Sequence, residues 1–102
     1  PNNLRGLGRR SGSLHDNFSS ADTMIQPGEI LTDELNEIGV SPVQAARELR
    51  IPSYRIYQIL AGKRAITADT ALRLGQWFGT GPELWLNLQT SYEVRKAEQM
   101  IG

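Results

Sequence analysis

Residues 47–64 read RELRIPSYRIYQILAGKR and contain five of the eleven Lys and Arg residues of a chain whose formal net charge is zero. Within this stretch Ile56, Ile59 and Leu60 recur at the spacing of one helix face, and the residues around them are polar or aromatic. Pro52 disfavours helical geometry at the residue before it, so one helix ends there and another begins after it. Two helices separated by three or four residues are typical of a helix-turn-helix.

Helix start and stop signals on both sides of this corner predict five helices. Ser41 and Pro42 mark the start of the second helix, with Gln44 placed to close a capping box, and Ser53 is expected to cap the third. The predicted helices span residues 27–38, 42–49, 53–61, 68–78 and 82–99, with Thr67 as the cap of the fourth. Because no segment shows sustained strand alternation, the sequence predicts an all-α fold, a five-helix bundle.

The N-terminal segment differs from the rest in composition. Residues 1–23 are rich in Gly, Ser, Asn and Arg with scattered apolar side chains, so we expect a disordered tail before one domain at 24–102. The first Met is Met24, directly before the first periodic segment, which favours a leader joined to a natural start there. The alternative is a basic arm whose three arginines reach into a DNA minor groove.

Composition argues against several classes of protein. The absence of Cys removes disulfides and thiolate metal sites, and the single His15 cannot build a metal cluster, so we expect no metal and no other cofactor. Ser and Thr hydroxyls lack a nearby His base, so we expect no catalytic residues and no enzyme. No apolar run approaches the roughly 20 residues that span a bilayer. A reducing cytoplasm fits this sequence.

The outer face of the helix at 53–61 has side chains suited to DNA. Arg can form two hydrogen bonds to guanine, Gln can form two to adenine, and Tyr or Ser can reach a base or a phosphate. The candidate base contacts are Ser53, Tyr54, Arg55 and Gln58, and Lys63 and Arg64 follow in a loop that suits the DNA backbone. The alternative is an ordinary exposed helix with Tyr54 and Tyr57 packed flat on a neighbour. Tyr57 falls toward the edge of the outer face.

Beyond these residues, the sequence VSPVQAARELRIPSYRIYQILAGKRAITADTALRLGQWFGTGPELWLNLQ, residues 40–89, resembles the helix-turn-helix antitoxins of the HigA type. These belong to the larger Xre family of Cro and phage-repressor-like DNA-binding domains. The likeness runs from Pro27 to Tyr92 and is most specific from Gly62 to Gln89. It implies a fold of the lambda-repressor type and base contacts from the four outward residues of the third helix, with Lys63 and Arg64 on the backbone.

Two positions depart from the family's usual pattern. Pro42 stands where the family usually has a phosphate-binding Gln, and Arg50 stands where it often has a Gly that ends the helix. Gln44, Arg47 or the Ser41 hydroxyl must therefore supply this phosphate contact. Tyr57 is a further candidate backbone contact, besides the two loop cations.

The resemblance also implies a function and partners. It predicts sequence-specific DNA binding by an antitoxin that represses its own toxin-antitoxin operon and neutralises a small, basic, RNA-cleaving toxin of the HigB type. The alternative is a stand-alone transcriptional regulator without a toxin. Glu29, Asp33, Glu34 and Glu37 form an acidic face on the first helix, which is either a solvated surface or a toxin-docking surface.

A second copy of the chain is the other expected partner. The core of so small a domain is marginal, and the last two helices hold more large aromatic residues than one side of it hides with ease. The candidates for a homodimer interface are Trp77, Leu84, Leu88 and Tyr92, each of which could instead fill the core. A dimer would place its two third helices in successive major grooves of a palindromic operator, about 34 Å apart.

Overall fold

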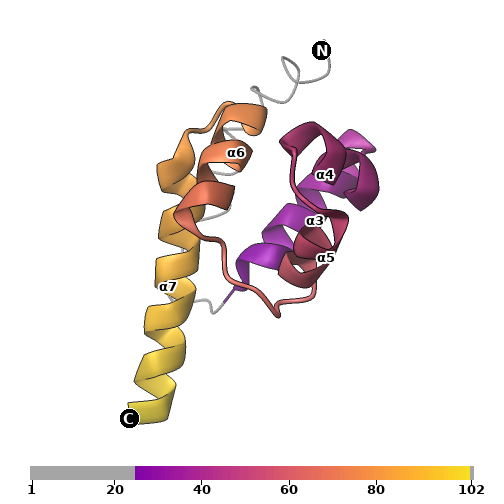
Figure 1. Cartoon of the computed structure of the whole chain (residues 1–102). Helices are drawn as coiled ribbons and strands as arrows, with labels where there is room; N and C mark the ends of the chain where they lie inside the picture. The colour runs from indigo at the N-terminus through magenta and orange to yellow at the C-terminus, as the bar shows by residue number, and fades with distance from the viewer. Residues whose placement is uncertain (1–24, 102) are drawn as a thin grey trace.

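The computed structural model describes residues 25–101, and the predicted tail at 1–23 and Met24 lie outside the described residues. Five helices follow one another along this range (Figure 1). They are α3 (Pro27–Ile38), α4 (Pro42–Leu49), α5 (Ser53–Leu60), α6 (Ala68–Phe78) and α7 (Pro82–Ile101). Residues 25–101 contain no strand. The predicted all-α fold of five helices is therefore confirmed.

Most helix boundaries lie where the sequence signals place them. Gly39 ends α3 with a φ of 72°, in the left-handed region that glycine adopts readily. The Ser41 hydroxyl accepts a hydrogen bond from the Gln44 backbone N–H at 3.1 Å, which caps α4. The Gln44 side chain donates to Glu48 instead of returning to the cap, so only half of the predicted capping box forms. Glu48 lies one turn further along the helix, where an amide group reaches it directly.

Two other end signals work differently from the prediction. Ser53 is the first residue of α5 rather than its cap, because Pro52 occupies the N-cap position with extended backbone. Thr67 is the N-cap of α6 but makes no side-chain capping hydrogen bond. The last helix continues two residues beyond its predicted end, to Ile101.

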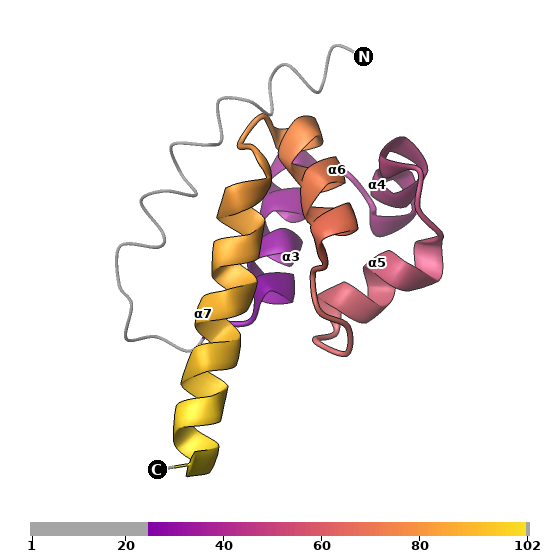
Figure 2. The same ribbon diagram turned by 60° about the vertical axis from the view of Figure 1, so that its left-hand side comes forward.

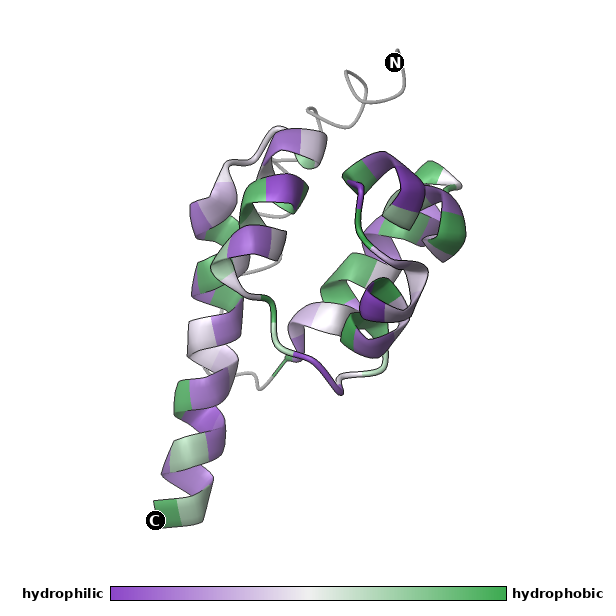
Figure 3. Cartoon of the chain, in the orientation of Figure 1, coloured by the Kyte–Doolittle hydropathy of each residue, from purple (hydrophilic) through white to green (hydrophobic). Residues whose placement is uncertain are grey.

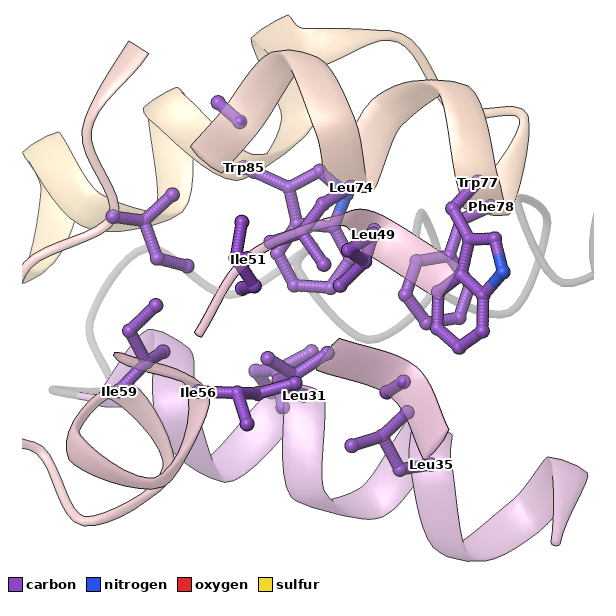
Figure 4. Close-up of a cluster of buried hydrophobic side chains, with 14 of the residues drawn as sticks. Leu31, Leu35, Leu49, Ile51, Ile56, Ile59, Leu74, Trp77, Phe78 and Trp85 are labelled. Atoms are coloured by element: carbon purple, nitrogen blue, oxygen red, sulfur yellow. The ribbon is translucent and has the colours of Figure 1, made fainter. Parts of the chain in front are cut away.

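The core lies between two groups of helices. One group is α6 and α7, which pack along each other. The other group is α3, α4 and α5, in which α5 packs against both α3 and α4. Side chains from both groups meet in the middle (Figure 4). The largest fully buried side chains are Trp85, Phe78, Leu31, Ile56, Ile59 and Leu74. Burial of these apolar residues is the main favourable contribution to folding in a domain of this size.

The aromatic residues of the last two helices are part of this core. The rings of Phe78 and Trp85 have centroids 5.4 Å apart, and those of Trp77 and Phe78 are 5.0 Å apart and nearly perpendicular. Such edge-on and tilted arrangements are the favourable ones for aromatic pairs. The aromatic cluster therefore joins α6 to α7 within a single chain.

Gly28 sets the distance between α3 and α5. A Cβ at this position would overlap the backbone carbonyl of Ile59, near the end of α5. The close approach of two backbones requires glycine here.

Replacing Gly28 by alanine should lower the free energy of unfolding by about 1 to 3 kcal/mol, since the backbones must separate to admit the methyl group. Helix propensity alone would favour alanine by about 1 kcal/mol, so a loss of stability isolates the steric effect. Urea unfolding followed by circular dichroism measures it. Asp33→Ala, at an exposed position of the same helix, is the control and should stay within about 0.5 kcal/mol. Equal effects from the two variants would contradict this account.

The last helix extends well past the rest of the domain. Two views show the C-terminal half of α7 projecting beyond the other helices (Figures 1 and 2). Most residues of this projecting half are hydrophilic, with hydrophobic residues between them and at its end (Figure 3). Within the described residues 93–101 no side chain is buried.

Candidate nucleic-acid interface

The corner between α4 and α5 has the predicted helix-turn-helix form. Arg50 ends α4 in the left-handed region, with a φ of 62°, and is the one residue other than glycine with positive φ between 25 and 101. The Ile51 N–H donates to the Ala46 carbonyl at 3.0 Å, and the Ile51 side chain is buried. This is the pattern of a Schellman turn, in which an apolar residue after the left-handed position packs back onto the helix. The arginine thus occupies the conformation that usually favours glycine.

The third helix of the described chain, α5, has two distinct faces. Ile56 and Ile59 are buried in the core, as their spacing predicts. Ser53, Tyr54 and Gln58 are exposed, and Tyr54 shows 61% of its surface. The candidate base-contacting residues therefore lie outside the core, with Arg55 half-buried among them.

The loop after α5 is joined to this outer face. Lys63 and Arg64 are both exposed. The Arg64 Nε donates to the Gln58 Oε1 at 2.7 Å, and the Arg64 guanidinium carbon lies 5.9 Å from the centre of the Tyr54 ring. Helix and loop therefore present one continuous polar and cationic surface, which we call the α5 face: Ser53, Tyr54, Gln58, Lys63 and Arg64.

Arg55 has a partner, Asp69, that no pattern in the sequence indicates. The Arg55 Nη1 donates to the Asp69 Oδ2 at 2.9 Å, and Asp69 lies in the first turn of α6. Asp69 also accepts from the Arg73 Nε, at 3.1 Å to Oδ1 and 3.2 Å to Oδ2. Arg55, Asp69 and Arg73 thus form one cluster. The spacing of four residues on one helix predicts the Asp69–Arg73 pair, whereas Arg55 reaches Asp69 only through the packing of the helices.

The two arginines affect the charge of this carboxylate. Hydrogen bonds from Arg73 and Arg55 lower the pKa of Asp69 below its ordinary value of 3.8. Because the pKa of Asp69 is lower in the folded than in the unfolded state, its ionisation stabilises the fold at pH values above the unfolded-state pKa. This stabilisation is lost as the pH falls through the folded-state pKa. Asp69 is therefore ionised at neutral pH, and the cluster holds two positive charges and one negative.

The candidate backbone contacts on α4 have different surroundings. Ser41 and Arg47 are exposed. Gln44 is half-buried, and its Nε2 donates to the Glu48 Oε2 at 3.1 Å. The Glu48 Oε1 accepts from the Trp77 indole at 3.0 Å. The Gln44 amide thus donates to a carboxylate, and the Ser41 oxygen caps the helix, so the Arg47 guanidinium and the Ser41 O–H are the exposed donors that could reach a phosphate here.

Tyr57, the remaining candidate, is half-exposed at the edge of α5.

The dimer candidates differ in how much surface they keep. Trp77 is 4% exposed and Leu88 is buried, so most of both side chains is used within one chain. Leu84 and Tyr92 are half-buried, and the Tyr92 hydroxyl accepts from the Gln26 Nε2 at 3.1 Å. Leu84 and Tyr92 have the larger free surface of the four.

The acidic face of α3 is smaller than the sequence predicts. Glu34 is 2% exposed and therefore does not belong to a solvated face, which corrects that expectation. Its position beside Leu35 and Leu31 turns it toward the core side of the helix. Glu29, Asp33 and Glu37 are exposed, and they recur every four residues.

Residues 25–101 contain neither a metal-binding cluster nor a helix that could cross a membrane. No group of three or more His, Cys, Asp or Glu side chains in this range could hold a metal ion. None of the described helices is long and apolar enough to cross a membrane.

Known proteins similar to this chain were compared in sequence and in fold. No protein-family model matches it. Virulence-associated protein I of Dichelobacter nodosus is 47% identical over 76 residues, which cover 74% of this chain and 70% of that protein. An addiction module antidote protein of the HigA family from Coxiella burnetii is 52% identical, with a TM-score of 0.73 over 74% of this chain and 84% of that one. The Pseudomonas aeruginosa antitoxin HigA, solved with the higBA promoter, is 40% identical, with a TM-score of 0.74 over 76% of this chain and 86% of that one.

Proposed function

Since the chain belongs to the HigA family of antitoxins, we propose that it binds a specific double-stranded DNA operator and represses the operon that encodes it. The observation that carries this proposal is the α5 face. Groups that hydrogen-bond to base edges stand exposed at the start of a helix whose other side is buried. The relative from Pseudomonas aeruginosa was solved with promoter DNA, which supports promoter DNA as the partner of this chain.

In this proposal the residues have separate tasks. Ser53, Tyr54, Arg55 and Gln58 contact bases in the major groove, where an α-helix fits and each base pair presents a distinct pattern of donors and acceptors. Lys63 and Arg64 contact phosphates from the loop, together with Ser41, Arg47, Tyr57 and, through its second amide hydrogen, Gln44. Phosphate contacts fix the protein's register on the duplex but do not distinguish sequences.

A homodimer on a palindromic operator completes the proposal. Two copies of α5 would enter successive major grooves about 34 Å apart. Leu84 and Tyr92 support a contact through the start and middle of α7, since each keeps part of its surface exposed.

We also propose that the protein neutralises a small, basic, RNA-cleaving toxin of the HigB type. The exposed carboxylates Glu29, Asp33 and Glu37 support α3 as the surface for such a partner, because complementary charge speeds association. Co-expression with the neighbouring reading frame tests it. Rescue of growth supports the antitoxin, and a harmless neighbour would favour the stand-alone regulator.

Lys63→Ala tests the phosphate contacts. The lysine is exposed in the loop beyond α5, so its loss should weaken all DNA sequences about equally and reduce the slope of log affinity against log salt by about 1. Fluorescence anisotropy with a duplex from upstream of the chain's own reading frame, and with a scrambled duplex, measures both quantities over a salt titration.

Arg95→Ala is the matched control for this loss of charge, since it removes a cation from the projecting half of α7. It should leave the slope unchanged within error. Preferential loss of affinity for the upstream duplex in Lys63→Ala would contradict a pure phosphate contact. Failure of the wild-type protein to distinguish the two duplexes would refute specific binding to this region.

A further inference from the structure

We infer that Asp69 is a positioning residue for DNA recognition: it holds the Arg55 guanidinium at the start of α5 so that the free edge of that group can read a guanine. This inference rests on the proposed DNA-binding function and adds to it a residue outside the helix-turn-helix. Asp69 belongs to the first turn of α6, fourteen positions after Arg55.

A chain of hydrogen bonds links Asp69 to the turn itself. The Arg73 Nη1 donates to the carbonyl of Leu49 at 2.9 Å and to that of Arg50 at 3.2 Å, both at the end of α4. The Arg73 Nε donates to Asp69, which accepts in turn from Arg55. The guanidinium of Arg55 is thus tied, through two side chains of α6, to the corner that sets the angle between α4 and α5.

The Arg55 guanidinium has donors left for a base. Arginine has five N–H donors in a planar fork, and Asp69 takes one of those on Nη1. The Nε and Nη2 donors lie side by side on another edge of the plane. Two adjacent donors of this kind match the O6 and N7 acceptors of guanine in the major groove. Arg55 can therefore keep its hydrogen bond to Asp69 and contact a base at the same time.

Holding the side chain in advance has an energetic advantage. A long arginine side chain that is free in solution loses rotamer freedom when it binds, which reduces affinity. Arg55 is held before DNA arrives, and its side chain is only 27% exposed. Because the carboxylate is shared by two guanidinium groups, the cluster keeps a net positive charge beside the DNA.

The inference predicts an energetic coupling between Asp69 and Arg55. Selection from a pool of duplexes with a randomised centre gives the preferred sequence of the wild-type protein. Affinities are then measured for that duplex and for duplexes in which each guanine is replaced. Asp69→Ala is expected to reduce discrimination at one guanine position per half-site by roughly three- to thirtyfold, as coupled side chains do. In the Arg55→Ala background the same substitution should have no further effect on discrimination.

Glu83→Ala is the matched control, because Glu83 is an exposed acidic residue in the first turn of the next helix. Removal of either carboxylate strengthens binding to all DNA through net charge, so the comparison isolates the positioning effect. Thermal unfolding checks that each variant is folded. If Asp69→Ala does not fold, Asp69→Asn, which keeps one acceptor oxygen, serves for the same coupling measurement.

The outcomes separate this inference from the proposed function. Guanine discrimination that depends on Arg55 and is unaffected by Asp69→Ala would overturn the inference and leave the function intact. Stronger operator binding in Asp69→Ala than in Glu83→Ala, with discrimination retained, would overturn it too and identify Asp69 as a competitor of the DNA. A wild-type protein that selects no sequence would refute specific binding itself, and the inference with it.

Discussion

Replacing Trp85 by alanine is expected to lower the free energy of unfolding by about 3 to 5 kcal/mol. The indole is fully buried, with 0% of its surface exposed, where α6 and α7 meet the helices on the other side of the core (Figure 4). Its removal forfeits the transfer free energy of a large aromatic side chain and leaves a cavity that the surrounding helices fill only partly. Small domains have total stabilities of about 5 to 15 kcal/mol, so much of the native population would be lost. Urea unfolding measures the change.

Two further variants show whether burial is the cause. Trp85→Phe keeps most of the ring volume and removes an indole N–H that has no hydrogen-bond acceptor among the described residues, so its loss should be clearly smaller. Met100→Ala, at an 80% exposed position of the same helix, should stay within about 0.5 kcal/mol. Similar losses for Trp85→Ala and Met100→Ala would mean that the indole is not the centre of this core.

Arg55→Ala is expected to weaken operator binding by about 1 to 3 kcal/mol and to relax base preference at one position per half-site. Arg55 is the one guanidinium on α5, and its bidentate match to guanine is the most specific contact available on that helix. Anisotropy titrations on the preferred duplex and on single-base variants measure both effects.

The same substitution should hardly affect stability. The ion pair between Arg55 and Asp69 is partly exposed, and such pairs contribute about 0 to 1 kcal/mol to the free energy of unfolding. Loss of binding in a variant that unfolds at the wild-type urea concentration therefore reports recognition rather than folding. If Arg55→Ala and Lys63→Ala both leave operator binding intact across a salt titration, α5 is not a recognition helix. A partner protein on this cationic surface would then be the better explanation.

The helices could be predicted from the sequence because their signals are local. Pro27, Gly39 and the Ser41–Pro42 pair fix the ends of the first two helices through backbone conformation and capping, which involve residues a few positions apart. The division of α5 into buried and exposed faces follows from the 3.6-residue repeat in the same way. The outward position of Ser53, Tyr54 and Gln58 therefore needed no tertiary information.

The contacts between helices could not be predicted in this way. The Trp77 hydrogen bond to Glu48 joins residues 29 positions apart, and this indole is buried within the domain. Glu34 belongs to an acidic series at helical spacing, yet its neighbours bury it. The bond between Arg55 and Asp69 depends on how α6 crosses the start of α5. Sequence spacing specifies which face of its own helix a residue occupies, and not which helix comes to that face.

The projecting half of α7 gives this helix two regions of different local stability. Near Trp85 its backbone hydrogen bonds are covered by the core, so they open only when the whole domain unfolds. Beyond Tyr92 they depend on helix propensity and on pairs such as Arg95–Glu98, and short helices of this kind are marginal in water. The free energy of local opening should therefore fall along the helix, from the global value in its first turns to lower values beyond Tyr92. We therefore expect the turns beyond Tyr92 to exchange between helix and coil while the first turns of α7 stay folded.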